Sequence, residues 1–269
     1  MELFILGSGT GEPSLKRSSS SILIKYNKIR ILLDIGPGTL KSFLKLGLDY
    51  SDIDFIFLTH FHPDHVLELP YLLFLYKNMK PIRKKPLCII GPKGLRNFYK
   101  GLLISYKDYI KENYPLRFKE ISSGYVRFGS FSQSEKSYPI CSVRKESPTG
   151  FIVRSLPFLH TENSIGFRFI FSNGKVIVYT GDTDYCENLV KLSKNADILL
   201  IESSFPDELK VAGHLSPSYV ARVATLADVK KVILIHMYPV CENFDIIGMI
   251  KREFYGVVLK GSDLMNIKV

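Results

Sequence analysis

The hydrophobic pattern of the first third of the chain is typical of short β-strands. Apolar runs rich in Ile, Leu and Phe are separated by turn residues such as Gly7-Ser8-Gly9 and Tyr26-Asn27-Lys28, as expected where strands alternate with tight turns. We therefore predict strands over residues 2–6, 20–25, 30–35 and 54–58. Gly36-Pro37-Gly38 interrupts the series before a helical pattern at residues 39–46.

The middle of the chain mixes helical and strand patterns. We predict helices over residues 66–79 and 93–112, a strand over residues 86–90, and several strands between residues 116 and 159. Ser172-Asn173-Gly174 separates two further β-type runs, at residues 164–171 and 175–179. Asn-Gly between such runs is a strong signal for a hairpin.

The last third predicts strands over residues 197–201, 231–235, 257–260 and 264–269, with helices over residues 217–227 and 242–254. Ser216 precedes Pro217 and is the expected N-cap of the first of these helices. No short-period repeat, low-complexity tract or long linker divides the chain. The pattern predicts an α/β fold in which residues 1–269 form a single domain.

Composition narrows the class of protein. The chain has 269 residues, 46% of them hydrophobic and 23% charged, which is ordinary for a folded protein and excludes intrinsic disorder. The formal net charge is +10, and a basic surface attracts phosphates, nucleic acid or anionic membranes. An AT-rich genome, which favours Lys codons, gives the same charge, and the sequence does not show whether the basic residues cluster.

Cysteine usage and the N-terminus indicate a cytoplasmic protein. The four cysteines lie far apart, without a Cys-x-x-Cys pair, which argues against a thiolate zinc site, a redox pair or a disulfide framework. Buried thiols are expected at Cys88, Cys141, Cys186 and Cys241. The N-terminus lacks the features of a signal peptide, and the longest apolar stretch, residues 66–76, is too short to span a membrane.

Four metal-competent side chains follow the predicted strand at residues 54–58. They are His60, His62, Asp64 and His65. Neutral imidazole and carboxylate are the usual non-thiolate ligands of zinc. Since the chain has only six histidines, three of them in one hexapeptide point to a metal site rather than to unrelated surface residues.

Further ligand types occur at the ends of other predicted strands. They are His160, Asp182 and His236. Each one alone could be a structural residue. One ion needs three protein ligands and a water molecule, and the repeated placement of a ligand type after an apolar strand favours a second ion.

Together these residues resemble the motifs of the metallo-β-lactamase superfamily. The pattern is Thr59-His60-x-His62-x-Asp64-His65, followed by His160, Gly181-Asp182 and His236. The resemblance implies a hydrolase with a four-layer αβ/βα sandwich and two metal ions, zinc first, with manganese or iron as alternatives. It implies one ion on His60, His62 and His160, a second on Asp64, His65 and His236, and Asp182 as the bridge. A hydroxide shared by the two ions would then attack phosphorus, and Asp64 would also orient it.

The segment Ala212-Gly213-His214-Leu215-Ser216-Pro217 is similar to the ribonuclease Z branch of that superfamily. The similarity implies that His214 contacts the scissile phosphate or protonates the leaving oxygen, with a capping or core histidine as the alternative. Glu202 would orient His214, or be a solvated or strand-end carboxylate.

Two departures separate the chain from ribonuclease Z. Ile201 stands where that branch usually has a histidine, and too few residues separate His160 from Asp182 for the arm that grips tRNA. We therefore predict a phosphodiesterase that acts on a small molecule or RNA, with tRNA 3′-processing as an alternative. A thioester or lactam hydrolase is a second alternative, although such enzymes usually lack the segment around His214. Relatives are often homodimers.

Substrate selection is expected in two loops, at residues 77–85 and 122–148. Their basic side chains would form a phosphate-binding rim or be solvated charges. These are Arg83, Lys84, Lys85, Arg127, Lys136, Arg144 and Lys145.

Overall fold

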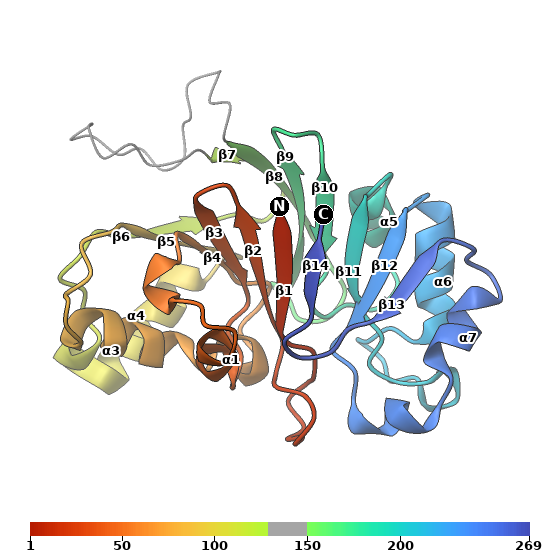
Figure 1. Ribbon diagram of the computed structural model, residues 1–269, viewed down its shortest axis with the longest axis horizontal. Helices are drawn as coiled ribbons and strands as arrows, with labels where there is room; N and C mark the ends of the chain where they lie inside the picture. Colours follow the sequence, from red (N-terminus) through yellow and green to blue (C-terminus); the bar gives the residue numbers. More distant parts are fainter. Residues whose placement is uncertain (129–149) are drawn as a thin grey trace. The chain divides into compact units, whose positions relative to one another are not determined.

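A computed structural model describes residues 1–128 and 150–269, which form two compact units. Unit 1 consists of Met1–Ile121, Ile235–Pro239 and Gly261–Val269. Unit 2 consists of Ser122–Leu234 and Val240–Lys260. The chain therefore returns to unit 1 twice after leaving it, and each unit contains one seven-stranded sheet (Figure 1).

The sheet of unit 1 has the strand order β14-β1-β2-β3-β4-β5-β6. The C-terminal strand pairs antiparallel with the N-terminal strand, and β1, β2 and β3 continue the antiparallel arrangement. From β3 to β6 the strands are parallel. The bounds are β1 Glu2–Gly7, β2 Ser21–Tyr26, β3 Ile29–Leu33, β4 Phe55–Phe57, β5 Leu87–Gly91, β6 Leu116–Glu120 and β14 Asn266–Lys268.

Helices α1 (Thr39–Lys45), α3 (Leu69–Asn78) and α4 (Leu95–Tyr106) cover one face of this sheet. Alternate strand residues such as Leu23, Leu32 and Ile56 pack with the helices in one buried cluster. The intervening strand residues, including Ile5 and Ile31, are buried as well. This explains why the strands are almost continuously apolar, since a sheet buried on both faces has no polar face to alternate with.

The sheet of unit 2 has the strand order β13-β12-β11-β10-β9-β8-β7. Strands β7 to β10 are antiparallel to one another, β11 is parallel to β10, and β13 is parallel to β12. Helix α6 packs beside α5 and α7 (Figure 1). The bounds are β7 Gly124–Phe128, β8 Phe151–Pro157, β9 Ile165–Phe171, β10 Val176–Tyr179, α5 Glu187–Ser193, β11 Ile198–Glu202, α6 Pro217–Leu226, β12 Lys231–Ile235, α7 Ile246–Lys251 and β13 Val257–Lys260.

Most predicted elements are confirmed, including the hairpin. Strands β9 and β10 pair antiparallel across Asn173-Gly174, where Gly174 adopts φ 81°. Two helix predictions were too long. Helix α4 ends at Tyr106, and the segment predicted as one helix over residues 242–254 divides into a 3₁₀ turn, Pro239–Asn243, and α7. The side chain of Asp245 begins α7 by accepting a hydrogen bond from the Gly248 amide. The short helix α5 was not predicted.

The predicted N-cap position of Ser216 is confirmed, but the capping hydrogen bond from its side chain is not. Ser216 occupies the N-cap position of α6 with extended backbone, but its side chain makes no capping hydrogen bond. Instead Asp207 accepts a hydrogen bond from the Ser218 amide at 3.0 Å. A carboxylate from a preceding loop thus satisfies the open end of the helix, which local sequence does not reveal.

The prediction of a basic substrate rim needs correction at Arg83. Arg83 is 6% exposed and donates to the carbonyl oxygens of Ser51, Ile53 and Pro86. It therefore joins the backbone at residues 51–53 to that at Pro86 and is not available to a phosphate. Lys136, Arg144 and Lys145 lie outside the described residues.

Two of the cysteines fit the prediction of buried thiols. Cys88 and Cys241 are buried, whereas Cys186 is partly exposed, and Cys141 lies outside the described residues.

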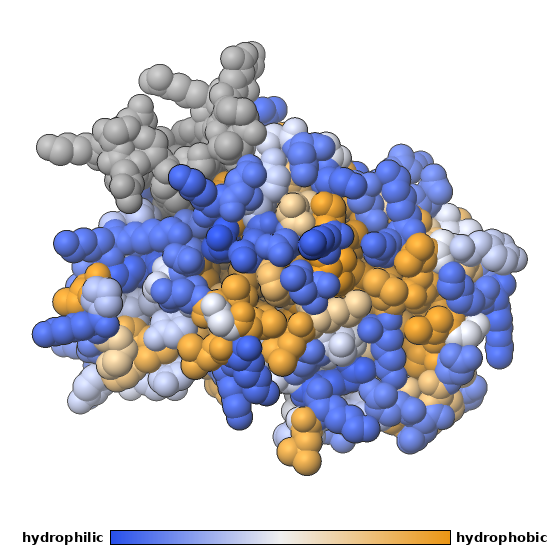
Figure 2. Space-filling model, viewed as in Figure 1, coloured by the Kyte–Doolittle hydropathy of each residue, from blue (hydrophilic) through white to orange (hydrophobic). Residues whose placement is uncertain are grey.

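Among residues 1–128 and 150–269, no helix has the length and apolar character needed to cross a membrane. On the visible face, hydrophilic side chains alternate with hydrophobic areas (Figure 2).

Candidate metal centre

The histidine-rich hexapeptide connects strand β4 to the short helix α2 (Pro63–Val66). His62 is the N-cap residue of α2, and Pro63 occupies its first turn, where the fixed φ of proline suits a helix start. His60 and His65 are fully buried, and the Asp64 side chain is 16% exposed. A strand and a helix therefore hold the predicted ligands on both sides of a short turn.

Within unit 1 the predicted ligands lie together. The rings of His60 and His62 are 4.6 Å apart between centroids, and those of His60 and His65 are 4.2 Å apart. One ligand atom each from Asp64, His65 and His236 lies within 4.8 Å of the others. The His236 Nε2 atom is 3.2 Å from Asp64 Oδ2. Five of the seven predicted ligands are thus neighbours within unit 1.

His236 reaches this group from the end of β12. It has φ 49°, a left-handed conformation that is uncommon for residues other than glycine and that concentrates at functional sites. The following Met237 amide donates to the Ser8 carbonyl at 3.3 Å. The backbone around His236 is therefore fixed to the loop after β1.

Asp34 orients two histidines of unit 1, His65 directly and His60 through Thr59. It follows β3 directly, is fully buried and has φ 54°. Its carboxylate accepts hydrogen bonds from the Thr59 amide at 2.8 Å, the Thr59 hydroxyl at 2.8 Å and His65 Nδ1 at 2.7 Å. These bonds compensate for removing the carboxylate from water. The sequence pattern predicts no role for Asp34.

The same bonds set the tautomers of two histidines. A carboxylate only accepts, so His65 carries its proton on Nδ1. The Thr59 hydroxyl donates its hydrogen to Asp34, so it accepts from His60 Nδ1, 3.0 Å away. Both neutral rings therefore present the Nε2 lone pair to the site. This arrangement, with the second ring nitrogen held by a carboxylate or hydroxyl, is typical of metal-bound histidines.

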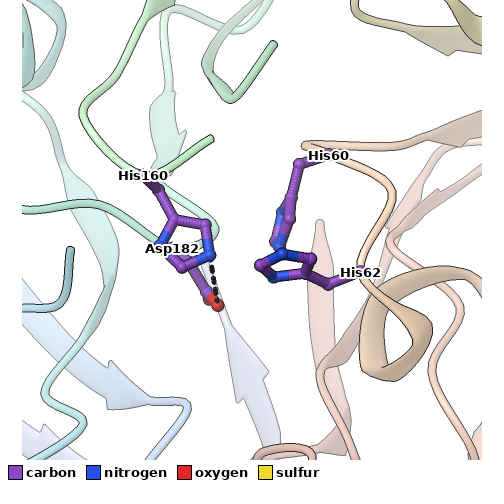
Figure 3. A group of neighbouring side chains, drawn as sticks. All are labelled: His60, His62, His160 and Asp182. Atoms are coloured by element: carbon purple, nitrogen blue, oxygen red, sulfur yellow. Dashed lines mark ion pairs between the residues drawn. The ribbon is translucent and has the colours of Figure 1, made fainter. Parts of the chain in front are cut away.

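Unit 2 holds His160 after β8 and Asp182 after β10. Their side chains meet, with His160 Nε2 3.6 Å from Asp182 Oδ2 (Figure 3). The Nδ1 atom of His160 lies 2.9 Å from the Gly213 carbonyl oxygen. A carbonyl carries no hydrogen, so Nδ1 donates, and His160 has the same tautomer as His60 and His65.

Glu202, which is buried, and His214, which is partly exposed, form a second pair in unit 2. Glu202 ends β11 and is fully buried, so the alternative of a solvated carboxylate is wrong. It accepts from His214 Nδ1 at 3.1 Å, and also from the Thr183 amide at 2.6 Å and the Leu215 amide at 3.2 Å. The His214 ring lies 4.8 Å from that of His160.

A further carboxylate, Asp184, holds the loop that carries His214. It accepts from the Gly213 amide at 2.9 Å and from Lys210 Nζ at 3.0 Å. Burial alone would raise the pKa of Asp184, but these hydrogen bonds outweigh it and hold the pKa below its ordinary value. The only signal in the sequence was its position two residues after Asp182.

Comparison with known proteins identifies the family. Residues 29–237 match the family model described as the beta-lactamase superfamily domain. The chain belongs to the β-lactamase superfamily. Among its relatives in the superfamily, ribonuclease Z of Nanoarchaeum equitans is 30% identical over 88% of this chain and 83% of that protein. Ribonuclease Z of Staphylococcus epidermidis is also 30% identical, over 88% of each chain.

Solved structures of superfamily members agree. The short form of human tRNase Z aligns with a TM-score of 0.74 and 25% identity, covering 100% of this chain and 99% of that one. The metallo-beta-lactamase fold protein YhfI of Bacillus subtilis aligns with a TM-score of 0.75 and 21% identity over 99% of both chains. The predicted α/β metallo-β-lactamase fold and the resemblance to ribonuclease Z are confirmed, and the chain is a metal-dependent hydrolase of this superfamily.

The donor atoms fit a divalent metal. They are imidazole nitrogens and carboxylate oxygens, without thiolate, a set that accepts zinc, manganese or iron. The tautomers of His60, His65 and His160 place a lone pair on Nε2 in each case.

Proposed function

We propose that this protein is a dinuclear metal-dependent phosphodiesterase that resembles ribonuclease Z but lacks its tRNA-binding arm. The observation that carries the proposal is the Glu202–His214 pair beside His160. Hydrolysis of a phosphodiester needs a proton donor for the leaving oxygen in addition to the metal ligands. A thioester or lactam hydrolase of the superfamily is less favoured because such enzymes usually lack the segment around His214.

The proposed ligand sets follow the family resemblance. His60, His62 and His160 hold one ion, and Asp64, His65 and His236 hold the other, with Asp182 as the bridging ligand. Zinc is the proposed metal, and manganese or iron are the alternatives. Two divalent ions supply a water molecule that loses its proton near neutral pH and stabilise negative charge on the phosphoryl oxygens.

The chain's own residues would then orient the attacking water and protonate the leaving oxygen. Asp64, besides holding a metal ion, would orient the attacking water. His214 is held at Nδ1 by Glu202, so its Nε2 atom is the one that meets the substrate. The buried Glu202 carboxylate stabilises the imidazolium form, and Nε2 gives its proton to the leaving oxygen.

The choice between substrates turns on the segment between His160 and Asp182. Strands β9 and β10 and the turn at Gly174 occupy it, which leaves no length for a protruding arm. This favours a small phosphodiester, or an RNA substrate that is bound without a protruding arm. Relatives named ribonuclease Z at 30% identity favour the second candidate, tRNA 3′-processing.

The remaining proposals concern the whole protein. We propose that residues 1–269 act as one catalytic domain, because the matched family region, residues 29–237, includes parts of both units. We also propose that the protein forms a homodimer and lies in the cytoplasm.

The deciding experiment compares two substrates with metal-loaded protein. Precursor tRNA with a 3′ trailer is tested beside bis(p-nitrophenyl) phosphate, using wild type, Asp64→Ala and His214→Ala, with Asp197→Ala as a carboxylate control elsewhere in unit 2. We expect hydrolysis of the model diester to be lost in Asp64→Ala and kept in Asp197→Ala. His214→Ala should slow cleavage of an RNA diester about 10²–10⁴-fold, because an alkoxide leaving group needs a proton, and should affect the model diester less, because p-nitrophenolate leaves without one.

The outcomes separate the candidates. Specific cleavage at the trailer junction would establish tRNA 3′-processing without the arm. Hydrolysis of the model diester alone would indicate a small-molecule phosphodiesterase. If neither substrate is cleaved by protein that has bound metal, phosphodiester hydrolysis is the wrong reaction.

A further inference from the structure

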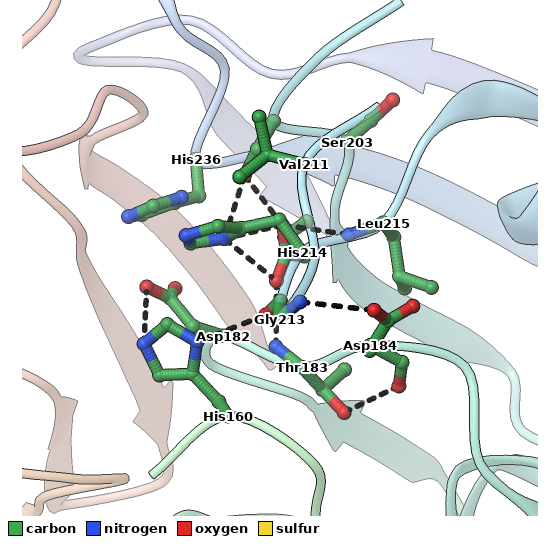
Figure 4. A network of polar contacts seen from close by, with 12 residues as sticks. His160, Asp182, Thr183, Asp184, Ser203, Val211, Gly213, His214, Leu215 and His236 are labelled. Atoms are coloured by element: carbon green, nitrogen blue, oxygen red, sulfur yellow. Dashed lines mark hydrogen bonds and ion pairs between the residues drawn. The ribbon is translucent and has the colours of Figure 1, made fainter. Parts of the chain in front are cut away.

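The loop before α6 is fastened to the strand-end loop that carries Asp182. Asp184 Oδ2 accepts two hydrogen bonds, from the Gly213 amide at 2.9 Å and from Lys210 Nζ at 3.0 Å. The other oxygen, Oδ1, accepts from the Tyr185 amide at 2.8 Å. One carboxylate thus joins the loop after β10 to both ends of the segment 210–213, and Figure 4 shows its contact with Gly213.

Gly213 passes this restraint on to His160. Its amide is held by Asp184, and its carbonyl oxygen accepts from His160 Nδ1 at 2.9 Å. The residue has φ 87°, and an added Cβ would lie 3.4 Å from His160 Nδ1. The left-handed backbone therefore favours glycine, and any side chain at this position would lie in van der Waals contact with the imidazole.

We propose that Asp184, clamped by Lys210, is a positioning residue that fixes the Gly213 backbone and thereby the Nδ1–H tautomer and ring orientation of His160. The inference rests on the proposed role of His160 as a metal ligand. Groups that orient a ligating histidine usually change metal affinity about 10–100-fold when they are lost. Since the same loop continues into His214, the clamp also sets the distance between the two imidazoles.

The chain contains a matched control for this cluster. Like Asp184, Asp197 accepts from a backbone amide distant in sequence, that of Val176 at 2.8 Å, and from a lysine, Lys230, at 2.8 Å. That pair holds the start of β10 and does not contact the loop of His214. The variants Asp197→Asn and Lys230→Met therefore measure the effect of losing an aspartate–lysine pair that does not contact the loop of His214.

Zinc titration of the folded variants tests the proposal, with a chromophoric chelator as competitor. We expect Asp184→Asn to weaken zinc binding about 10-fold at one of two sites, whereas Asp197→Asn binds zinc as wild type does. Lys210→Met distinguishes a positioning role of Lys210 from an electrostatic effect of its charge on zinc binding. Removing a cation near the site strengthens cation binding if only electrostatics acts, but weakens it if the clamp positions His160, and Lys210→Arg should restore the affinity.

The measurement does not depend on turnover. Lys210→Met with unchanged or tighter zinc binding would overturn the proposal, and so would an equal loss in Asp197→Asn. Gly213→Ala provides a second variant that leaves Asp184 intact, and normal zinc affinity there would also contradict it. Failure of the wild type to cleave any phosphodiester while it binds zinc would remove the proposed function and leave this inference standing.

Discussion

Asp34 and Glu202 are fully buried carboxylates, and each holds the Nδ1 atom of one histidine. Backbone amides also donate to each, from Thr59 to Asp34 and from Thr183 and Leu215 to Glu202, which makes a buried negative charge tolerable. Asp34 follows β3 directly and Glu202 ends β11, so a strand holds each carboxylate in place. The carboxylates therefore determine which nitrogen each imidazole presents, and the metal ligands can act only with that nitrogen.

The sequence predicted the metal ligands, but not the carboxylates that hydrogen-bond to the ligands or to the backbone beside them. The hexapeptide at residues 60–65 stands out because three of six histidines occur there. Asp34 and Asp184 have no such signal, because a single aspartate after a strand is common. Their roles arise from partners 25 to 31 residues away for Asp34 and 26 to 29 for Asp184, which only the folded chain brings together.

Asp34→Asn tests the orientation of His65. Asparagine has one acceptor oxygen where the carboxylate has two, so it cannot serve Thr59 and His65 equally well. We expect zinc binding to weaken about 10–100-fold while the protein stays folded, as measured by zinc titration and circular dichroism. The exposed Asp52→Asn is the control in the same unit, and unchanged affinity in Asp34→Asn would show that His65 needs no such partner.

At the scale of elements, the turn that carries the ligands is packed tightly against the end of β3. The Ile35 amide donates to the His65 carbonyl at 2.8 Å. An added Cβ at Gly36 would lie 2.0 Å from the Asp64 carbonyl oxygen. Only glycine allows this approach, so the predicted chain break at Gly36-Pro37-Gly38 also has a role in placing the metal ligands.

Gly36→Ala should therefore move the ligand turn. We expect the free energy of unfolding to fall by about 1–3 kcal/mol, as in other overpacked sites, together with weaker zinc binding. Urea unfolding measures the first effect. Gly101→Ala is the matched control, because nothing lies within 4 Å of its Cβ position in α4 and it should stabilise the protein by about 0.5–1 kcal/mol. Equal stability of Gly36→Ala and wild type would contradict the tight packing.

Helix α6 shows why a capping residue can be misassigned from sequence. Ser216 stands at the correct position, but the Asp207 carboxylate provides the cap. Local sequence marks the start of the helix through Pro217, and it cannot show that a loop nine or more residues earlier folds back onto it. Element bounds were therefore predictable here, whereas the hydrogen bonds that fix them were not.

The Asp207 cap has a defined pH dependence. Burial raises the pKa of Asp207, but hydrogen bonds from Ser216 and Ser218 outweigh it, so the pKa lies below the ordinary value of 3.8. A lowered folded pKa means stability that is present above the unfolded pKa and lost as the pH falls through the folded one. We expect Asp207→Ala to cost about 1 kcal/mol at pH 7, and the difference from wild type to shrink as the pH falls below about 4, towards the lowered folded pKa. A constant difference across urea denaturation curves from pH 7 to pH 3 would exclude an ionised cap.

For the whole molecule, the division of the chain was the least predictable feature. The segments Ile235–Pro239 and Gly261–Val269 belong to unit 1, although unit 2 precedes each of them. Hydrophobic periodicity predicts that β12 and β14 exist, but it does not predict that Glu2 pairs with Lys268. Such pairings depend on long-range packing, which a pattern along the chain does not encode.

The same division distributes the proposed ligands unequally. His60, His62, Asp64, His65 and His236 belong to unit 1, and His160 and Asp182 belong to unit 2. Neither unit alone holds the full set. If the proposed sets are correct, metal binding requires both units in the native state, and bound metal stabilises the whole fold by mass action.

Removal of metal is therefore expected to lower the stability of the entire protein. At a free zinc concentration of about 100 times the dissociation constant, one bound ion contributes about 2.7 kcal/mol, so chelation should lower Tm by several degrees in one cooperative transition. His160→Ala removes a unit 2 ligand and should reduce the difference between zinc-loaded and chelated samples, whereas Asp197→Ala should keep it. Differential scanning calorimetry with and without chelator measures all three proteins. A Tm that rises with zinc equally in wild type and His160→Ala would place the ion on unit 1 alone and contradict the proposed ligand sets, because His160 then contributes nothing to binding.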